Sequence, residues 1–279
     1  METKLVQKFG NSGHIVLPKE YVGKRIRFIA EPKTFEDIKS EVLEFLKSYF
    51  GNILGVYLYG SYARGEQTID SDVDILVITN TKLKIAEKAD DYSIISATME
   101  EIDGILNTNA VLILPILKEA RTIINPMLLD KYKEYKFTKG NVKYFVDSCK
   151  KIIELNKKGL ELDFEIGSLV YSLMLRIRGL LMINLSLQSK HYSKSLLFNF
   201  LEDYDLKKHK IEELYKIYSS ERNDVKVRES SILKKEDIKK LISIIEKLLE
   251  DLTISLRWAR KNIKKELKAS KNKLTFIEI

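Results

Sequence analysis

The sequence predicts an α+β fold in three parts, on three observations. Alternating apolar segments surround a glycine-containing turn near the N-terminus, which predicts a β-hairpin module over residues 1–32. Two apolar, β-branched runs, Ile53–Tyr59 and Val73–Thr79, predict strands of a small mixed sheet with flanking helices over residues 33–136. Over residues 137–279 apolar side chains recur at three- and four-residue steps, which predicts an α-helical bundle.

The predicted hairpin has two alternating segments, residues 4–9 and 14–17, joined by the turn Gly10-Asn11-Ser12-Gly13. A third alternating segment, residues 24–30, follows it. About thirty residues cannot bury a core of their own. We therefore expect this module to pack on the rest of the chain or on a second copy.

The first strand of the predicted sheet ends at Gly60-Ser61. Because Gly60 has no Cβ, its backbone can approach a ligand closely. Residues from Ser61 onward can open a short helix whose free N–H groups face an anion. This turn predicts a site for the phosphate tail of a nucleotide.

Two aspartates, Asp72 and Asp74, occur where the second predicted strand begins. A strand repeats every two residues, so their side chains lie on one face and Val73 points away. Two adjacent carboxylates repel each other unless a cation lies between them, and Mg²⁺ prefers oxygen ligands and bridges phosphates. The pair indicates metal-assisted phosphoryl or nucleotidyl transfer, and the alternative is a solvated strand end.

Helices and one more strand complete the predicted sheet domain. The apolar spacing predicts helices over residues 35–50 and 83–106, and the run AVLILPIL at residues 110–117 predicts a third strand. Pro126 marks the exit from this domain. The bundle is predicted to contain helices over residues 142–155, 164–185, 193–204, 211–218 and 235–267.

One apolar stripe in the last predicted helix is assigned to the bundle core rather than to a cofactor. Its members are Leu241, Ile244, Ile245, Leu248, Leu249 and Leu252.

Composition favours a cytoplasmic protein with an acidic or nucleic-acid partner. The net charge is +8 over 279 residues, which attracts anionic partners without distinguishing among them. Cys149 is the single cysteine, so no internal disulfide can form. The most apolar stretch, residues 179–187, is shorter than a membrane span, so no transmembrane helix is expected.

The segments GSYARGE and SDVD resemble the GSx10DxD signature of polymerase-β-like nucleotidyltransferases, in the minimal nucleotidyltransferase branch. The resemblance covers residues 35–127. It implies that Gly60 and Ser61 bind the nucleotide phosphates, that Asp72 and Asp74 bind Mg²⁺ as the catalytic pair, and that Arg64 touches the triphosphate.

That family usually presents a third carboxylate from a later strand, where it helps to hold the ion that activates the attacking hydroxyl. Residues 104–118, which include the predicted third strand, contain no acid. The nearest candidates are Asp103 and Glu119.

Two further resemblances concern the ends of the chain. The segment KFGNSGHIVLP resembles half of the swapped hairpin of AbrB- and MazE-like DNA-binding proteins, which implies a homodimer that grips DNA through a basic rim. The bundle resembles the HEPN superfamily, whose ribonuclease members carry Arg, a short gap and His. Here Arg222 is followed by Arg228 without a histidine, so ribonuclease activity is not expected.

The leading hypothesis is a Mg²⁺-dependent nucleotidyltransferase that moves NMP, by resemblance AMP from ATP, onto an acceptor hydroxyl of a protein. The alternative is a dimeric, DNA-binding, antitoxin-like regulator with a degenerate nucleotidyltransferase domain. Transfer to RNA or to a small molecule shares the same site. The basic segment 257–273, with Trp258, is either a surface that follows a phosphate backbone or a solvated helix face.

Overall fold

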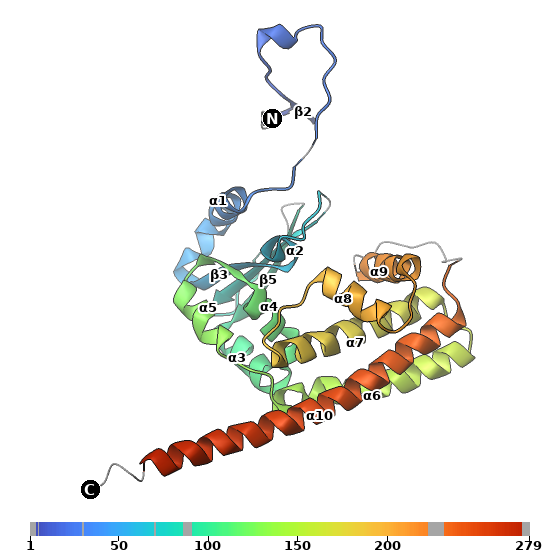
Figure 1. Ribbon diagram of the computed structural model, residues 1–279. Helices are drawn as coiled ribbons and strands as arrows, with labels where there is room; N and C mark the ends of the chain where they lie inside the picture. The colour runs from blue at the N-terminus through green and yellow to red at the C-terminus, as the bar shows by residue number, and fades with distance from the viewer. Residues whose placement is uncertain are drawn as a thin grey trace.

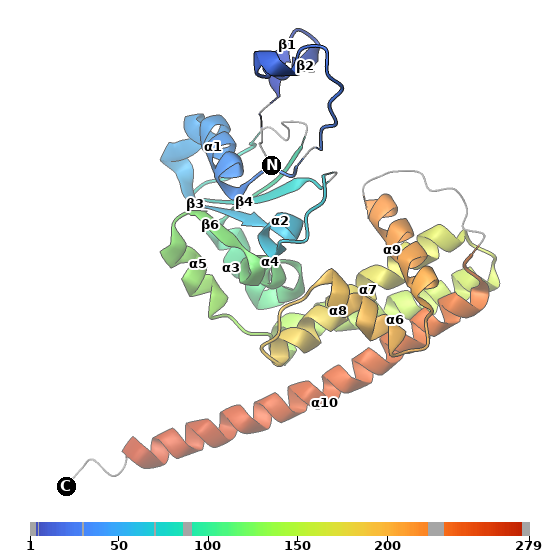
Figure 2. The ribbon, with the colours of Figure 1, turned by 45° about the horizontal axis from the view of Figure 1, so that its top comes forward.

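The computed structural model describes residues 4, 6–29, 31–69, 71–85, 91–222 and 232–274, and side chains as far as residue 254. A small N-terminal hairpin stands off a mixed sheet, and a bundle of helices packs beside that sheet (Figures 1 and 2). Arg228 and the side chains of the basic segment 257–273 lie outside the described residues. The three-part division of the chain stays a prediction.

The hairpin is shorter than expected. Strand β1 (Gln7–Phe9) pairs antiparallel with β2 (Ser12–His14) around Gly10-Asn11. The described part of residues 24–30 forms no strand, so the expected third segment is wrong. Every residue of the two strands is exposed, because so short a unit has no interior.

The central sheet has the order β5-β4-β3-β6. Its strands are β3 (Ile53–Tyr59), β4 (Val73–Thr79), β5 (Tyr92–Thr98) and β6 (Arg121–Ile124). Strand β3 runs antiparallel to β4 and β6, whereas β4 and β5 are parallel. The sheet is therefore mixed, as the sequence predicts.

The two faces of the sheet belong to different cores. On one face, helix α1 (Phe35–Leu46) buries Ile38, Val42 and Leu46 against the sheet. On the other face, Tyr57, Leu76 and other side chains join a core that continues into the bundle. The sheet and the bundle thus share one continuous apolar interior, which holds them beside each other.

Two predicted elements of this domain are wrong. Strand β5 lies in the middle of the helix expected over residues 83–106. Helix α3 (Met99–Thr108) covers only the end of that range. The run AVLILPIL is a short 3-10 turn (Ala110–Leu112) followed by helix α4 (Leu114–Glu119). Pro115 explains the second error: it lacks an N–H, which excludes it from an inner strand but suits a first helical turn.

The bundle follows helix α5 (Pro126–Lys133), which begins at the residue predicted as the exit of the sheet domain. Its helices are α6 (Lys139–Glu161), α7 (Ile166–Leu187), α8 (Lys194–Glu202), α9 (Lys208–Arg222) and α10 (Lys235–Leu274). They agree closely with the predicted helices. The apolar stripe of α10 is buried, which confirms its assignment to the core.

Helix α7 is longer than the apolar stretch noted at residues 179–187, which forms its second half. By length and composition it is the one helix among the described residues that could cross a membrane, and half of its apolar window is buried inside the molecule. It packs against α6, α9 and α10. A central helix of a bundle is apolar on all sides for that reason.

The short helix α2 (Gly60–Arg64) completes the fold between β3 and β4.

Candidate functional site

The turn at Gly60 brings the phosphate motif against the aspartate strand. Gly60 has φ +75°, and a Cβ built on it would lie 2.0 Å from Oδ2 of Asp74. A side chain at residue 60 would therefore be strained and would occupy the place of the carboxylate. Close approach to Asp74 is thus one physical reason for glycine at this position.

Asp72 and Asp74 both line a cavity of about 850 Å³, together with Gly60 and Ser61. Asp74 lies on β4 opposite Tyr59 of β3, so the sheet pairing places the carboxylate beside the turn. Burial raises the pKa of Asp74 to about 6; Arg222 opposes this rise and the charge of Asp72 adds to it. The predicted carboxylates and the predicted turn therefore share one cavity.

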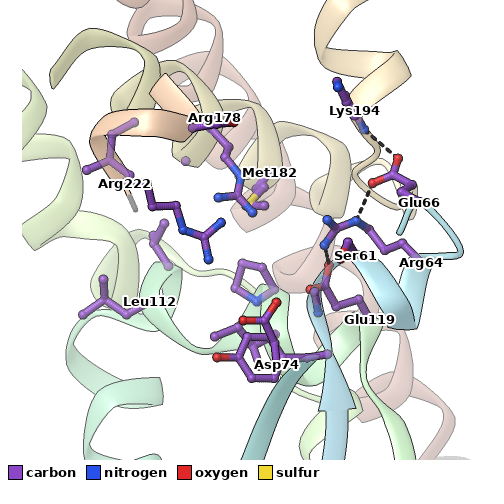
Figure 3. A pocket seen from close by; sticks show the side chains of 18 of the residues that line it. Ser61, Arg64, Glu66, Asp74, Leu112, Glu119, Arg178, Met182, Lys194 and Arg222 are labelled. Atoms are coloured by element: carbon purple, nitrogen blue, oxygen red, sulfur yellow. Dashed lines mark hydrogen bonds and ion pairs between the residues drawn. The ribbon is translucent and has the colours of Figure 1, made fainter. Parts of the chain in front are cut away.

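Arg64 also lines the cavity, but its guanidinium is already engaged. Its Nε donates to Glu66 at 2.8 Å, and its Nη1 donates to Glu119 at 2.8 Å (Figure 3). The other oxygen of Glu119 accepts the backbone N–H of Gly60 at 2.9 Å. Glu66 in turn accepts the backbone N–H of Lys194, which opens α8. This chain of contacts ties the phosphate turn to the helical bundle.

The third carboxylate expected from the family is absent from the strand beside the aspartates. That strand is β5, and its residues on the face of Asp74 are Ser93, Ile95 and Ala97, since Asp74 pairs with Ser93 and the strands are parallel. Ile95 lines the cavity. Of the two candidates named from the sequence, Glu119 lines the cavity, and Asp103 is not among its lining residues.

The two aspartates can hold Mg²⁺ only with help from a ligand. Within the described part of the chain no group of three or more His, Cys, Asp or Glu side chains could hold a metal. Mg²⁺ commonly binds one or two carboxylates and takes its other ligands from phosphates and water. Two carboxylates that line one cavity are therefore compatible with a divalent ion that arrives with a nucleotide.

Four basic side chains of the bundle line one side of the cavity, and the sequence did not predict them as site residues. Arg176 and Arg178 of α7, Lys194 of α8 and Arg222 of α9 line the same cavity. Arg178 donates to the hydroxyl of Tyr218 at 3.0 Å. Arginines within the largely apolar helix α7 were the available signal, because a charged side chain in such a helix needs a partner or a ligand.

Apolar side chains line the remainder of the cavity. They include Leu112, Pro115, Ile116, Phe145 and Met182, and they come from both the sheet domain and the bundle. Such surface suits the flat face of a nucleobase, while the charged side chains suit phosphates. The cavity therefore combines features that a nucleoside triphosphate requires.

Comparison with known proteins supports this description. Residues 39–164 match the family model described as a nucleotidyltransferase domain, and residues 3–29 match a putative transposon-encoded protein family, DUF2080. A putative protein adenylyltransferase of Methanocaldococcus jannaschii is 30% identical over 132 residues, which cover 44% of this chain and 86% of the relative.

Two solved structures show weaker similarity. One is the spectinomycin adenyltransferase AAD(9) from Enterococcus faecialis with ATP and spectinomycin, at 16% identity and TM-score 0.45, covering 78% of this chain and 100% of that one. The other is a nucleotidyltransferase-like protein from Exiguobacterium sibiricum, at 13% identity and TM-score 0.38, covering 82% and 80%.

Proposed function

The chain belongs to the nucleotidyltransferase family, and we propose that it is the Mg²⁺-dependent kind that transfers AMP from ATP to an acceptor hydroxyl. The observation that carries the proposal is the close approach of Gly60 to Asp74, in a cavity that Ser61 and Asp72 also line. The archaeal relative is named as a putative protein adenylyltransferase, which favours a protein as the acceptor. A cytoplasmic location belongs to the same proposal.

In this proposal the turn and the aspartates divide the work. Gly60 and Ser61 lie against the phosphates, where the missing Cβ allows close approach. Asp72 and Asp74 hold the metal, which, when bound, neutralises charge on the transferring phosphate. The acceptor oxygen attacks the α-phosphorus, the bond to the pyrophosphate oxygen breaks, and pyrophosphate leaves. Positioning of these groups accounts for most of the catalysis in such reactions.

Arg64 has a conditional role. Its guanidinium forms ion pairs with Glu66 and Glu119. A phosphate that enters the turn competes with Glu119 for the N–H of Gly60 and for the guanidinium. Arg64 can then contact the triphosphate while it keeps its bond to Glu66.

Label transfer from ATP tests the proposal. The protein is incubated with Mg²⁺, each of four labelled NTPs in turn, and cell extract, and the modified products are identified by mass spectrometry. The Asp72→Ala, Asp74→Ala double variant is expected to transfer no label. Its matched control is Glu36→Ala, Glu44→Ala, which removes two exposed carboxylates of α1 that lie outside the cavity. Equal labelling by the aspartate variant and the wild type would refute the proposal.

A second candidate, the dimeric DNA-binding regulator, is favoured by the exposed apolar side chains of the N-terminal module. Val16, Val22, Phe28 and Ile29 are each at least 66% exposed in the single chain, which is typical of a surface that meets a partner. Light scattering and salt-dependent binding to promoter DNA test it. The full chain is expected to form a dimer and to bind DNA at low salt, and a variant without residues 1–32 is expected to do neither. A full chain that is monomeric and does not bind DNA at low salt would eliminate this candidate.

A further inference from the structure

Among the described residues, the side chains of two cavity arginines, Arg176 and Arg222, form no hydrogen bond or ion pair. Arg222 is exposed at the cavity, whereas Arg176 is partly buried. Nε of Arg176 is buried without an acceptor. Arg64 and Arg178, by contrast, each donate to a side chain. A buried guanidinium nitrogen without an acceptor is costly, so a ligand anion is the expected partner.

The position of Arg222 separates it from the phosphate turn. Figure 3 shows its guanidinium reaching toward Asp74 from the bundle, while Ser61 and Arg64 lie on the other side of that aspartate. The charge of Arg222 also acts on Asp74, because it counters the rise in the pKa of that carboxyl. In an in-line displacement the attacking oxygen lies opposite the leaving group. With pyrophosphate at Ser61, Arg222 faces the acceptor.

Among the described residues that line the cavity, the carboxylates other than Asp72 and Asp74 are Glu66 and Glu119, and both are hydrogen-bonded. Ile95 stands on β5 where an acid would complete the metal and base arrangement. Glu119 lies at the phosphate turn, where both of its oxygens accept hydrogen bonds. An acceptor that brings its own negative charge would both pair with the arginines and supply the missing proton acceptor.

We propose that the acceptor carries an anionic group, a phosphate monoester or a carboxylate, next to the attacked hydroxyl, and that Arg176 and Arg222 bind this group. The inference rests on the proposed nucleotidyl transfer and names its substrate class. The hydroxyl proton passes to an oxygen of the anionic group while the hydroxyl oxygen bonds to the α-phosphorus and pyrophosphate leaves. Arg176 and Arg222 then determine specificity for the acceptor rather than affinity for ATP.

A second cavity adjoins the first. It measures about 570 Å³ and shares Tyr144 and Ser148 of α6 with the first cavity. Lys143 and Lys151 line it with one acid, Asp147. The described lining of this neighbouring cavity therefore carries a net positive charge, which suits an acceptor that is acidic beyond the reacting group.

Anion binding to the nucleotide-loaded protein tests the inference. Inorganic phosphate and, separately, acetate are titrated calorimetrically into protein saturated with Mg²⁺ and α,β-methylene-ATP. At least one anion is expected to bind the wild type, and Arg176→Gln and Arg222→Gln are expected to weaken it about tenfold or more. Stronger binding of phosphate indicates a phosphate monoester, and equal or stronger binding of acetate indicates a carboxylate.

The control is Lys208→Gln, which removes the same charge at the opposite end of α9. It should bind anion and nucleotide as the wild type does, and circular dichroism confirms that each variant is folded. Failure of both anions to bind the wild type, or loss of nucleotide rather than anion in the arginine variants, would overturn the inference. If the ATP analogue itself does not bind, the proposed function fails, and the same titration without nucleotide still tests the arginines.

Discussion

Replacement of Gly60 by alanine tests whether the turn and the aspartate act as one unit. Gly60 and Gly65 have nearly the same left-handed φ, +75° and +70°, so alanine should cost about 1–2 kcal/mol of unfolding free energy at either position. Only Gly60→Ala meets a neighbour, since a Cβ there lies 2.0 Å from Oδ2 of Asp74 and none lies within 4 Å at Gly65. Gly65→Ala is therefore a matched control for backbone strain.

The overlap between an alanine Cβ at residue 60 and Asp74 determines how much transferase activity Gly60→Ala should lose. An ordinary contact begins near 3.4 Å, so the Asp74 carboxylate and the new methyl group must move apart by about 1.4 Å. A misplacement of about 1 Å in a catalytic group can lower the rate about 100-fold. We expect Gly60→Ala to lose about 100-fold or more in label transfer and Gly65→Ala to retain near wild-type transfer, with both destabilised in urea unfolding. Equal activity of the two variants would show that the turn does not support the carboxylate.

Three further predictions concern the carboxylates. The pKa of Asp74 in the folded protein is raised to about 6, so metal-free stability should fall as the pH rises from about 4 to about 6 and stay level above that. Asp74→Asn should therefore gain up to about 3 kcal/mol at pH 8 and little at pH 4 in thermal unfolding, while it abolishes transfer. Glu119→Ala leaves Nη1 of Arg64 and the N–H of Gly60 without their partner, while Nε of Arg64 keeps Glu66. It should cost about 2–3 kcal/mol in urea, whereas Glu119→Gln, which keeps the acceptor for Gly60, should cost about 1 kcal/mol. Ile95→Asp adds the absent carboxylate, and Ile95→Asn is its uncharged control. The aspartate variant should transfer label to neutral hydroxyl acceptors about tenfold faster, or more, than the asparagine variant. An equal rate for the two variants would show that the cavity needs no further acid.

Local sequence signals were enough for much of the fold. The three- and four-residue apolar steps predicted the bundle helices, and two apolar runs predicted β3 and β4, because side-chain periodicity reflects which face is buried. Strand β5 was missed because it forms the edge of the sheet and is only partly buried, so its apolar pattern is weak. The assignment of residues 110–117 to a strand failed at Pro115, whose preference for a first helical turn was visible in the sequence.

The sequence alone predicted which residues meet at the turn. Gly60-Ser61 and Asp72/Asp74 lie within fifteen residues of one another, at the end of β3 and the start of its neighbour β4, so short-range geometry brings them together. Only the tertiary structure decided what faces them. Glu119 reaches Gly60 from 59 residues away and Lys194 reaches Glu66 from 128 residues away. Arg176 and Arg222 enter the cavity only because the bundle packs on the sheet through a shared apolar core. Contacts between distant segments depend on how whole elements pack, and no local pattern encodes them.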